Sequence, residues 1–381
     1  MVPNCVNKII FSKTKKNNTL KKYPILSVII LAIVFCTGCT RTNNYIKPEL
    51  HTIQKTDKYI MVILVHGTIF PVPNAGVFFS SLHQFLSSGR KLNKSWYQLY
   101  LDQLQDKSIY KYQPSGPEGL HLITEQLSAC LASAILQKFF SDQFSKCAVY
   151  TFCWNGKLSN KERVKAGCKL YLELFEEIKK LNKNYKNLEV YLMCHSHGGN
   201  VGLNLVHAEQ KFKKNLSIDR LILFGIPVQS ETAGHLKSQI FKRVYNFYSR
   251  GDNVQKIDIL STDDNWSQRT FETQDNLTQV DLSCDNLKPG HNELWLFGGK
   301  DNWLYRQYKL SISPFPLFVF TPVILQTLDK NFTESHDLKL NIKRDKKTKK
   351  LLFLFSDNKN KQEISVDTTI LDKYKKIILS F

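Results

Sequence analysis

The stretch from Leu188 to Asn200 constrains the fold more than any other part of the sequence. It begins with an apolar run typical of a buried strand and passes, at Ser196, into a segment with small and apolar residues at helical spacing. A strand that turns sharply into a helix holds the corner side chain in a strained, exposed position, where a serine hydroxyl can attack a carbonyl carbon. Ser196 is therefore the candidate nucleophile.

Small residues are needed two positions before and two positions after such a serine, because larger side chains would collide with the neighbouring strand or helix. Gly198 meets this requirement, whereas Cys194 stands where glycine is usual. For the pentapeptide alone, a serine without a catalytic role in a glycine-rich turn is the alternative. With its strand and helix, the segment resembles the nucleophile elbow of the α/β-hydrolase superfamily, specifically its lipase-like and esterase-like members with H-S-x-G-G, here His195 to Gly199.

An earlier apolar run, Tyr59 to Val65, is typical of a strand buried on both faces of a parallel sheet. It ends at His66, Gly67 and Thr68, which resemble the loop that supplies half of the oxyanion hole in the same superfamily. Gly67 lets the backbone approach a substrate closely. The resemblance implies the N–H groups of Thr68 and His197 as the two oxyanion donors. By itself, the His-Gly pair fits a simple turn after a strand better.

The candidate acid follows a later strand. Residues 218–228 and 243–254 each combine an apolar run with a turn, and the second ends in Gly251 and Asp252. The resemblance implies a triad acid in the loop after such a strand, and Asp252 fits that place, although an aspartate that caps a turn is the alternative. The competing carboxylates are Asp258, Asp263 and Asp264.

The general base should follow the acid in chain order. His291 is the only histidine between Asp252 and His336, and His336 is too close to the C-terminus to be preferred. We interpret His66, His195 and His197 as residues that line the site, since His195 and His197 lack a third zinc ligand at any telling spacing. The mechanism that the resemblance implies needs neither a metal ion nor an organic cofactor.

Alternation of strands and helices predicts the fold class. The strand at 148–154, the amphipathic helix at 160–181 and the elbow indicate an α/β domain over 58–330 with a doubly wound, mostly parallel sheet of the α/β-hydrolase type. The long excursion at 69–146 is a possible helical cap or lid, although core helices account equally well for its apolar residues.

The C-terminal part has a different pattern. We expect the apolar, proline-rich residues 304–328 to pack outside the hydrolase core. Short alternating runs in 331–381 predict a small β-hairpin appendage. Its basic turn at 343–350 could contact anionic lipid headgroups, or it could be a solvated loop, which is the interpretation we favour at this point.

The N-terminus predicts export. Residues 1–22 carry six lysines and no acid, and the apolar run from Pro24 to Gly38 is short for a membrane span. Gly38 and Cys39 resemble a lipoprotein signal, in which Cys39 would be acylated; an uncleaved anchor is the alternative. Both interpretations make 1–39 a signal or anchor and 40–57 a linker, and place the domain outside the cytoplasm, tethered to a membrane of the cell envelope.

The formal charge of +20 on 381 residues suggests a polyanionic partner such as anionic lipid or nucleic acid. No helix carries a basic face interleaved with aromatic residues, so nucleic acid is not the expected partner. Three of the nine cysteines lie in the first forty residues, and the other six include no C-x-x-C pair. One or two disulfide bridges are conceivable in an exported protein. Oligomeric state has no sequence signal.

The ordered set of Ser196, Asp252 and His291 therefore predicts a serine hydrolase that cleaves a small-molecule or lipid carboxylic ester. Two other functions stay open. One is an acyltransferase that uses the same triad with an alcohol acceptor. The other is a non-catalytic, membrane-tethered binding protein of the same fold, which Cys194 would favour.

Overall fold

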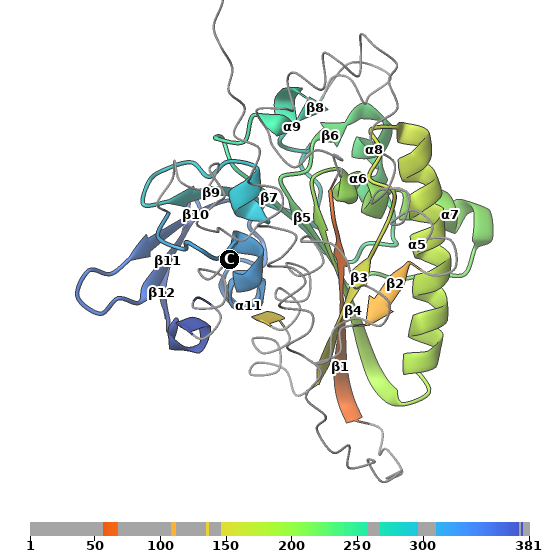
Figure 1. Ribbon diagram of the computed structural model, residues 1–381, viewed down its shortest axis with the longest axis horizontal. Helices are drawn as coiled ribbons and strands as arrows, with labels where there is room; N and C mark the ends of the chain where they lie inside the picture. Colours follow the sequence, from red (N-terminus) through yellow and green to blue (C-terminus); the bar gives the residue numbers. More distant parts are fainter. Residues whose placement is uncertain are drawn as a thin grey trace, which may run out of the picture. The chain divides into compact units, whose positions relative to one another are not determined.

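The computed structural model describes residues 56–67, 108–111, 135–136, 146–257, 267–295, 310–372 and 375. Its centre is a ten-stranded sheet with the order β12-β11-β10-β9-β7-β5-β4-β1-β3-β2 (Figure 1). All neighbours from β10 to β3 pair in parallel, whereas β12, β11 and β2 pair antiparallel at the two ends. The described residues thus form an α/β fold with a mostly parallel sheet, as the sequence predicted.

The parallel strands are the apolar runs of the sequence. They are β1 (Thr56–Val65), β3 (Cys147–Phe152), β4 (Tyr185–His195), β5 (Arg220–Phe224), β7 (Val244–Tyr248), β9 (Leu277–Cys284) and β10 (Asp337–Arg344). Alternate side chains of β1, β3, β4, β5 and β7 enter two separate hydrophobic clusters, one on each face of the sheet, whereas β10 contributes to one cluster only. Continuous apolar runs are the consequence of this burial on both faces.

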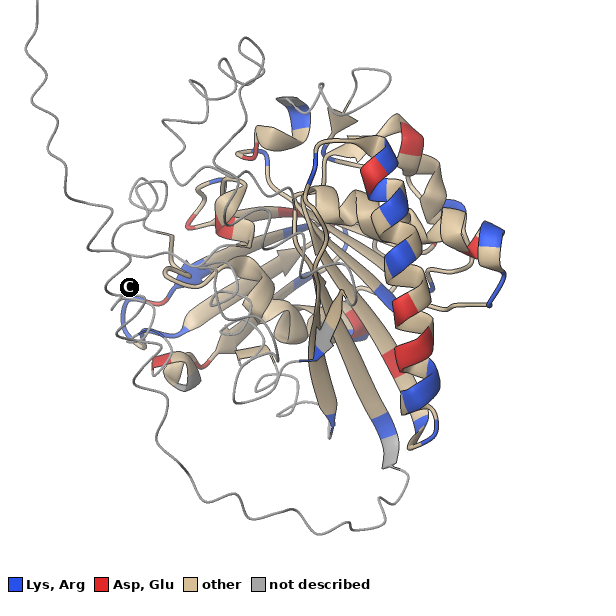
Figure 2. Ribbon diagram, turned by 45° about the vertical axis from the view of Figure 1, so that its right-hand side comes forward, with Lys and Arg blue, Asp and Glu red and all other residues tan. Residues whose placement is uncertain are grey.

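One face is covered by α5 (Asn160–Leu181), α6 (His197–Leu203) and α7 (Leu205–Phe212). Helix α5 begins after Ser159, whose side chain accepts a hydrogen bond from the N–H of Glu162 as an N-cap. Its apolar side packs on the sheet through residues such as Leu170 and Leu174, while basic and acidic residues occupy its outward side (Figure 2). The predicted helix at 160–181 is confirmed.

The opposite face is covered by η3 (Leu317–Phe320) and α11 (Thr321–Asn331). The prediction that residues 304–328 pack outside the core is wrong for the described part, because Phe318, Phe320 and Leu325 are buried in the cluster on this face. Pro316 precedes η3 and Pro322 lies in the first turn of α11, where a proline is tolerated. The prolines divide the segment into short elements that still deliver their apolar side chains to the sheet.

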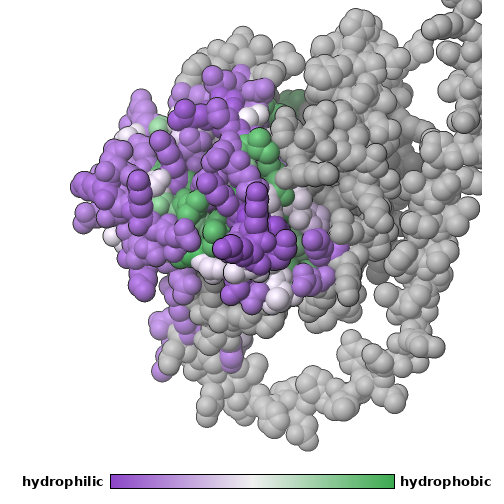
Figure 3. All heavy atoms as spheres, turned by 90° about the vertical axis from the view of Figure 1, so that its left-hand side faces the viewer, coloured by the Kyte–Doolittle hydropathy of each residue, from purple (hydrophilic) through white to green (hydrophobic). Residues whose placement is uncertain are grey.

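The C-terminal strands are β10, β11 (Leu351–Ser356) and β12 (Lys361–Val366). The sequence predicted them as a small β-hairpin appendage, but in the structure they continue the central sheet, with β10 paired in parallel to β9. Alternation in β10 places Leu338, Leu340 and Ile342 in the same cluster as η3 and α11, which explains the pairing. Figure 3 shows that the described surface at this end is largely hydrophilic, with a small hydrophobic area.

Most of the possible lid at 69–146 lies outside the described residues. Within it, β2 (Ile109–Lys111) adds an antiparallel edge strand beside β3, and Ile135 and Leu136 are buried in the cluster with η3 and α11. The backbone N–H groups of Ser108 and Ile109 donate to the carboxylate of Glu173 on α5. This part of the excursion therefore belongs to the body of the fold.

Short elements form the loops around the sheet. They are β6 (Val228–Gln229), α8 (Ser230–Ala233), η1 (Gly234–Lys237), α9 (Val254–Ile257), β8 (Ser267–Gln268), η2 (Asn292–Leu294) and η4 (Thr369–Leu371). Among the described residues, no helix combines the length and the apolar character that crossing a bilayer requires. Five cysteines in the described ranges, at positions 147, 153, 168, 194 and 284, are free thiols.

Candidate active site

Ser196 lies at the junction between β4 and α6, at the carboxyl edge of the sheet. Its backbone has φ 51° and ψ −131°, a conformation that residues with a side chain rarely adopt. The N–H of Ser196 donates to the carbonyl of Phe224 at 2.9 Å, which ties the corner to the end of β5. Such a strained residue costs about 1–3 kcal/mol and persists only where its surroundings hold it. The predicted strand-to-helix corner is thus present, with the serine at its apex.

The segment after β1 lies directly against this corner. A Cβ atom added at Gly67 would come within 2.8 Å of the Cβ of Ser196. One added at Gly198 would collide with the backbone carbonyls of Val65 and His66. Both glycines therefore permit the close approach of the β1 end to the start of α6. The sequence predicted this packing role for Gly198, whereas it predicted close approach to a substrate for Gly67.

Cys194 has a packing partner that the sequence analysis missed. Its side chain is fully buried below the corner, and a Cβ atom at Gly202 would lie 3.0 Å from its sulfur. Gly202 is one turn into α6, so the absence of a side chain there leaves the room that the thiol occupies. The corner therefore accommodates a cysteine two positions before Ser196, because Gly202, which faces its sulfur, has no side chain.

The candidate acid and base form a hydrogen bond. Nδ1 of His291, in the loop after β9, lies 2.7 Å from Oδ2 of Asp252, in the loop after β7. Asp252 is completely buried. A carboxylate accepts only, so Nδ1 carries the hydrogen and Nε2 is left to face a reaction partner. The sequence separates these residues by 39 positions, and the parallel strands bring them together at one edge.

Gly225 makes this hydrogen bond possible. It has φ +60°, and a Cβ atom there would lie 2.9 Å from Oδ2 of Asp252 and 3.3 Å from Nδ1 of His291. Any side chain at this position would therefore press on both members of the pair, in addition to the strain of its left-handed backbone. The sequence predicts only a turn after the strand here and indicates no role for Gly225 beside the acid and the base.

The acid loop is held from several sides. Nε of Arg269 donates to the carbonyl of Asp252 at 2.9 Å, and the N–H of Gln255 donates to Oδ1 of Asp252 at 3.4 Å. The side-chain amide of Gln255 also donates to the carbonyl of Ile226 at 2.8 Å. These bonds orient the carboxylate toward His291. The competing candidates Asp258, Asp263 and Asp264 lie outside the described residues.

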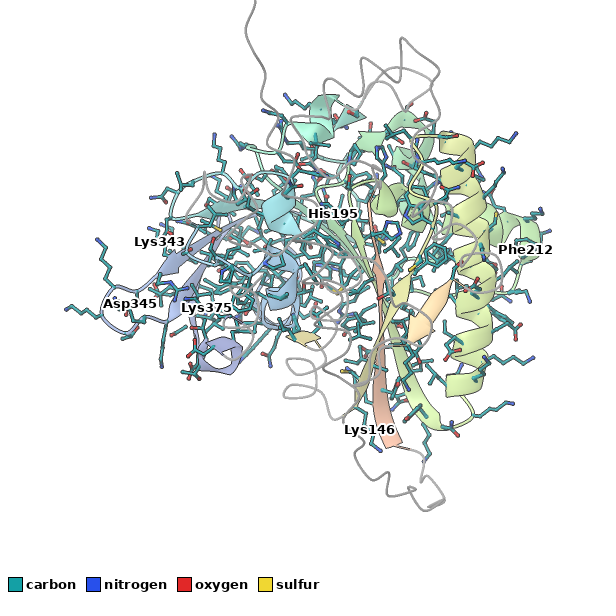
Figure 4. All side chains as sticks on the ribbon, viewed as in Figure 1. Lys146, His195, Phe212, Lys343, Asp345 and Lys375 are labelled. Atoms are coloured by element: carbon teal, nitrogen blue, oxygen red, sulfur yellow. The ribbon has the colours of Figure 1, made fainter. Side chains whose placement is uncertain are left out.

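His195 connects the corner to the base loop. Its ring stacks on Trp295 with centroids 5.3 Å apart, and it lies 4.6 Å from the ring centroid of His291. Nε2 of His195 is 3.3 Å from the carbonyl oxygen of His291 and must be the donor, because a carbonyl only accepts. Burial, and then the nearby His291, lower the pKa of His195 well below its ordinary value. Figure 4 places His195 at the end of the sheet opposite Lys146.

His66 anchors the other flank of the corner. Its Nδ1 donates to the carbonyl of Gly67 at 2.7 Å, and its Nε2 accepts from the backbone N–H of Trp154 at 3.2 Å. The indole N–H of Trp154 donates in turn to the carbonyl of His66 at 2.9 Å. Burial lowers the pKa of His66 to about 4, so a neutral ring holds the end of β1 to the end of β3.

The structure thus gathers Gly67, Ser196, His197, Asp252 and His291 at the carboxyl edge, with His66, His195 and Gly198 around them. Among the described residues, the Ser196 hydroxyl makes no hydrogen bond. Thr68 and Cys39 lie outside the described ranges. His336 lies elsewhere, with Nδ1 3.2 Å from the carbonyl of Leu277 at the opposite edge of the sheet.

Glu293 and Trp295 were not singled out from the sequence. Glu293 is buried, and a Cβ atom at Gly290 would lie 2.8 Å from its carboxylate, so the carboxylate rests on the base loop. Burial raises the pKa of Glu293. Trp295 packs between His195 and Phe318. Neither residue belongs to a motif, and only their position after His291 could have drawn attention to them.

Comparison with known proteins adds no family. No protein-family model matches the chain, and the search of curated proteins gave no match.

Proposed function

We propose that this protein is a serine hydrolase of the α/β-hydrolase type that cleaves a carboxylic ester. The observation that carries the proposal is the hydrogen bond between the buried carboxylate of Asp252 and the ring of His291, formed at the same sheet edge where Ser196 is held in a strained corner. A structural pair of His and Asp would not need a serine with positive φ beside it, and strained residues concentrate at functional sites.

In the proposed reaction, His291 takes the hydroxyl proton of Ser196 through Nε2 while Oγ of Ser196 attacks the ester carbonyl. Asp252 keeps Nδ1 protonated and stabilises the imidazolium that forms. The tetrahedral oxyanion is held by the N–H of His197 and by that of Thr68. His291 then returns the proton to the leaving alcohol. A water molecule, activated by the same imidazole, finally releases the acid from Ser196.

The hydroxyl of Ser196 and the ring of His291 must meet for this reaction. Contacts of this kind are often long in unliganded enzymes and tighten with substrate. The contact between the rings of His195 and His291, whose centroids are 4.6 Å apart, supports this proximity because His195 is the neighbour of Ser196 in the chain. Packing of Cys194 against Gly202 supports a corner that is intact despite the cysteine, which weakens the case for a non-catalytic protein.

Three finer features belong to the same proposal. Parts of residues 69–146 other than β2, Ile135 and Leu136 contribute a cap or lid over the acyl pocket, the chain is exported, and Cys39 or an uncleaved anchor tethers it to a membrane. The substrate is a small-molecule or lipid ester. These features follow from the sequence patterns and from the resemblance described above.

Substitution of Ser196 by alanine tests the proposal. We expect S196A to lose turnover of a short p-nitrophenyl ester by at least roughly a thousandfold while keeping its melting temperature. Exposed Ser230 on α8 provides the control, and S230A should retain turnover. A fluorophosphonate probe should label the peptide that contains Ser196 in the wild type only. Equal turnover in S196A and wild type, or a label on another residue, would reject Ser196 as the nucleophile.

A further inference from the structure

The β10–β11 hairpin concentrates the positive charge of the chain. Residues 339–361 contain nine Lys or Arg and two Asp or Glu, a difference of +7, compared with +20 for all 381 residues. About a third of the net charge therefore lies in a short segment of two strands and their turns. Lys346, Lys347, Lys349 and Lys350 in the turn are all exposed.

The turn is organised by its own side chains. The carboxylate of Asp345 accepts from the N–H of Lys347 at 2.9 Å and from the hydroxyl of Thr348 at 2.6 Å. Arg344 donates to the carbonyl of Lys349 at 3.0 Å and to that of Ser311 at 2.6 Å. The one acidic residue of the turn is thus occupied in holding the backbone.

The lysines of α5 are in a different situation. Lys165, Lys169 and Lys180 form ion pairs with glutamates one turn away, at 2.7, 3.8 and 3.3 Å, and Figure 2 shows both signs of charge along that helix. No ion pair with a described carboxylate involves the four turn lysines. Exposed ammonium groups without such partners keep a strong local positive potential.

Topology places this turn on the catalytic edge. Because β10 runs parallel to β9, β7, β5 and β4, the turn that follows Arg344 lies at the same edge as Ser196 after β4 and His291 after β9. In Figure 4, Lys343 and Asp345 lie on a hairpin that projects from the body, away from Phe212 on α7.

Two leucines lie beside the turn on the outward face of this sheet end. Leu352 pairs with Lys343 and Leu354 with Asn341 in the antiparallel register, so these side chains share one face. Both leucines are only half-buried, whereas Leu351, Phe353 and Phe355 on the other face are buried in the core. Figure 3 shows hydrophobic area within the hydrophilic surface here.

We propose that Lys346, Lys347, Lys349 and Lys350, with Leu352 and Leu354, form a docking surface for an anionic lipid bilayer. Lysines attract anionic headgroups, and partly exposed aliphatic side chains beside them favour the boundary between headgroups and acyl chains. A single-stranded nucleic acid would be expected to find aromatic side chains on such a surface, and these six residues include none. Docking through a turn on the catalytic edge would bring the site of the proposed hydrolase near the lipid, a consequence that rests on the proposed function.

Co-sedimentation of the full chain with vesicles tests the docking surface. Phosphatidylcholine vesicles are compared with vesicles that also contain phosphatidylglycerol. The test variant is K346Q/K347Q/K349Q/K350Q. The control variant is K179Q/K180Q/K183Q/K186Q, which removes the same charge from exposed lysines around the end of α5 and the start of β4, at the opposite edge of the sheet.

We expect the wild type and the control variant to bind the anionic vesicles more tightly than the phosphatidylcholine vesicles. In the hairpin variant, the ratio of these two affinities should be at least about tenfold lower. Salt should weaken the preference, since the charges are exposed. The N-terminal segment is identical in all variants, so only differences between them are interpreted. Equal losses in both variants, or no loss in the hairpin variant, would overturn the proposal. Preference for duplex DNA over the anionic vesicles would also overturn it.

The docking result is separable from catalysis. S196A should bind anionic vesicles as the wild type does, and the hairpin variant should hydrolyse a soluble short ester at the wild-type rate. A wild type that does not hydrolyse the ester would contradict the proposed hydrolase but not the docking surface. A wild type that does not prefer anionic vesicles would contradict the docking surface but not the proposed hydrolase.

Discussion

His195 touches three parts of the site although it is only the neighbour of the candidate nucleophile. It precedes Ser196 in β4, stacks on Trp295, and donates a hydrogen bond to the carbonyl of His291. The sequence predicts it to be one of the residues that line the site. The hydrogen bond to His291 could not be foreseen, because it joins residues 96 positions apart through a loop whose path has no sequence signature.

Substitution of His195 by phenylalanine should loosen the base loop. Phenylalanine keeps a ring that can stack on Trp295 but removes the donor to His291. We expect kcat to fall roughly tenfold to a hundredfold with little change in KM, because small displacements of a catalytic group are costly. H195Q, which retains a donor, should recover part of the loss.

Hydrogen exchange supplies a readout that does not depend on catalysis. Amide protons in residues 285–295 should exchange faster in H195F than in the wild type. If kcat and exchange in this loop both match the wild type, His195 does not position His291.

At the scale of single elements, the corner between β4 and α6 shows where sequence patterns succeed and where they stop. Apolar runs and helical spacing predicted β4 and α5 because both signals are local. The departure at Cys194 could not be resolved from the sequence, since its compensation by Gly202 depends on the approach of α6 to β4. The position of residues 310–328 on the sheet was missed for the same reason: prolines reveal where helices break but not what they cover.

Because Gly202 leaves room for the side chain of Cys194, substitutions at these two positions should have non-additive effects on the free energy of unfolding. G202A should lower the free energy of unfolding by about 1–3 kcal/mol, because its methyl group would press on the sulfur. In a C194A background the same substitution should cost less, by roughly 1 kcal/mol. Urea unfolding of the four proteins measures this difference. Additive effects of the two substitutions would show that Gly202 is not required by Cys194.

At the scale of the whole molecule, two neutral histidines link the site to the stability of the fold. Burial lowers the pKa of His66 from 6.5 to about 4 and also lowers that of His195. Nε2 of His66 accepts from Trp154 and Nδ1 donates to Gly67, so a second proton would break the bond to Trp154. Below pH 6.5 these two histidines are therefore protonated more readily in the unfolded chain than in the folded chain.

Stability should accordingly fall as the pH is lowered from about 6.5 toward about 4. Thermal unfolding at a series of pH values measures the slope. H195F removes one of the histidines whose pKa burial lowers and should reduce the slope, whereas H336Q, a substitution at the far edge of the sheet, should not. A melting temperature that is constant across this range would contradict the burial of neutral rings at these positions.

The insertion of β10 between β9 and β11 has a consequence for shortened forms of the chain. A protein cut before residue 331 would lose the partner of β9 and present that strand as an open edge, with unpaired amide and carbonyl groups. Such a fragment would be prone to pair with copies of itself and to precipitate. Pairing of β10 with β9 therefore protects the protein from association through this edge.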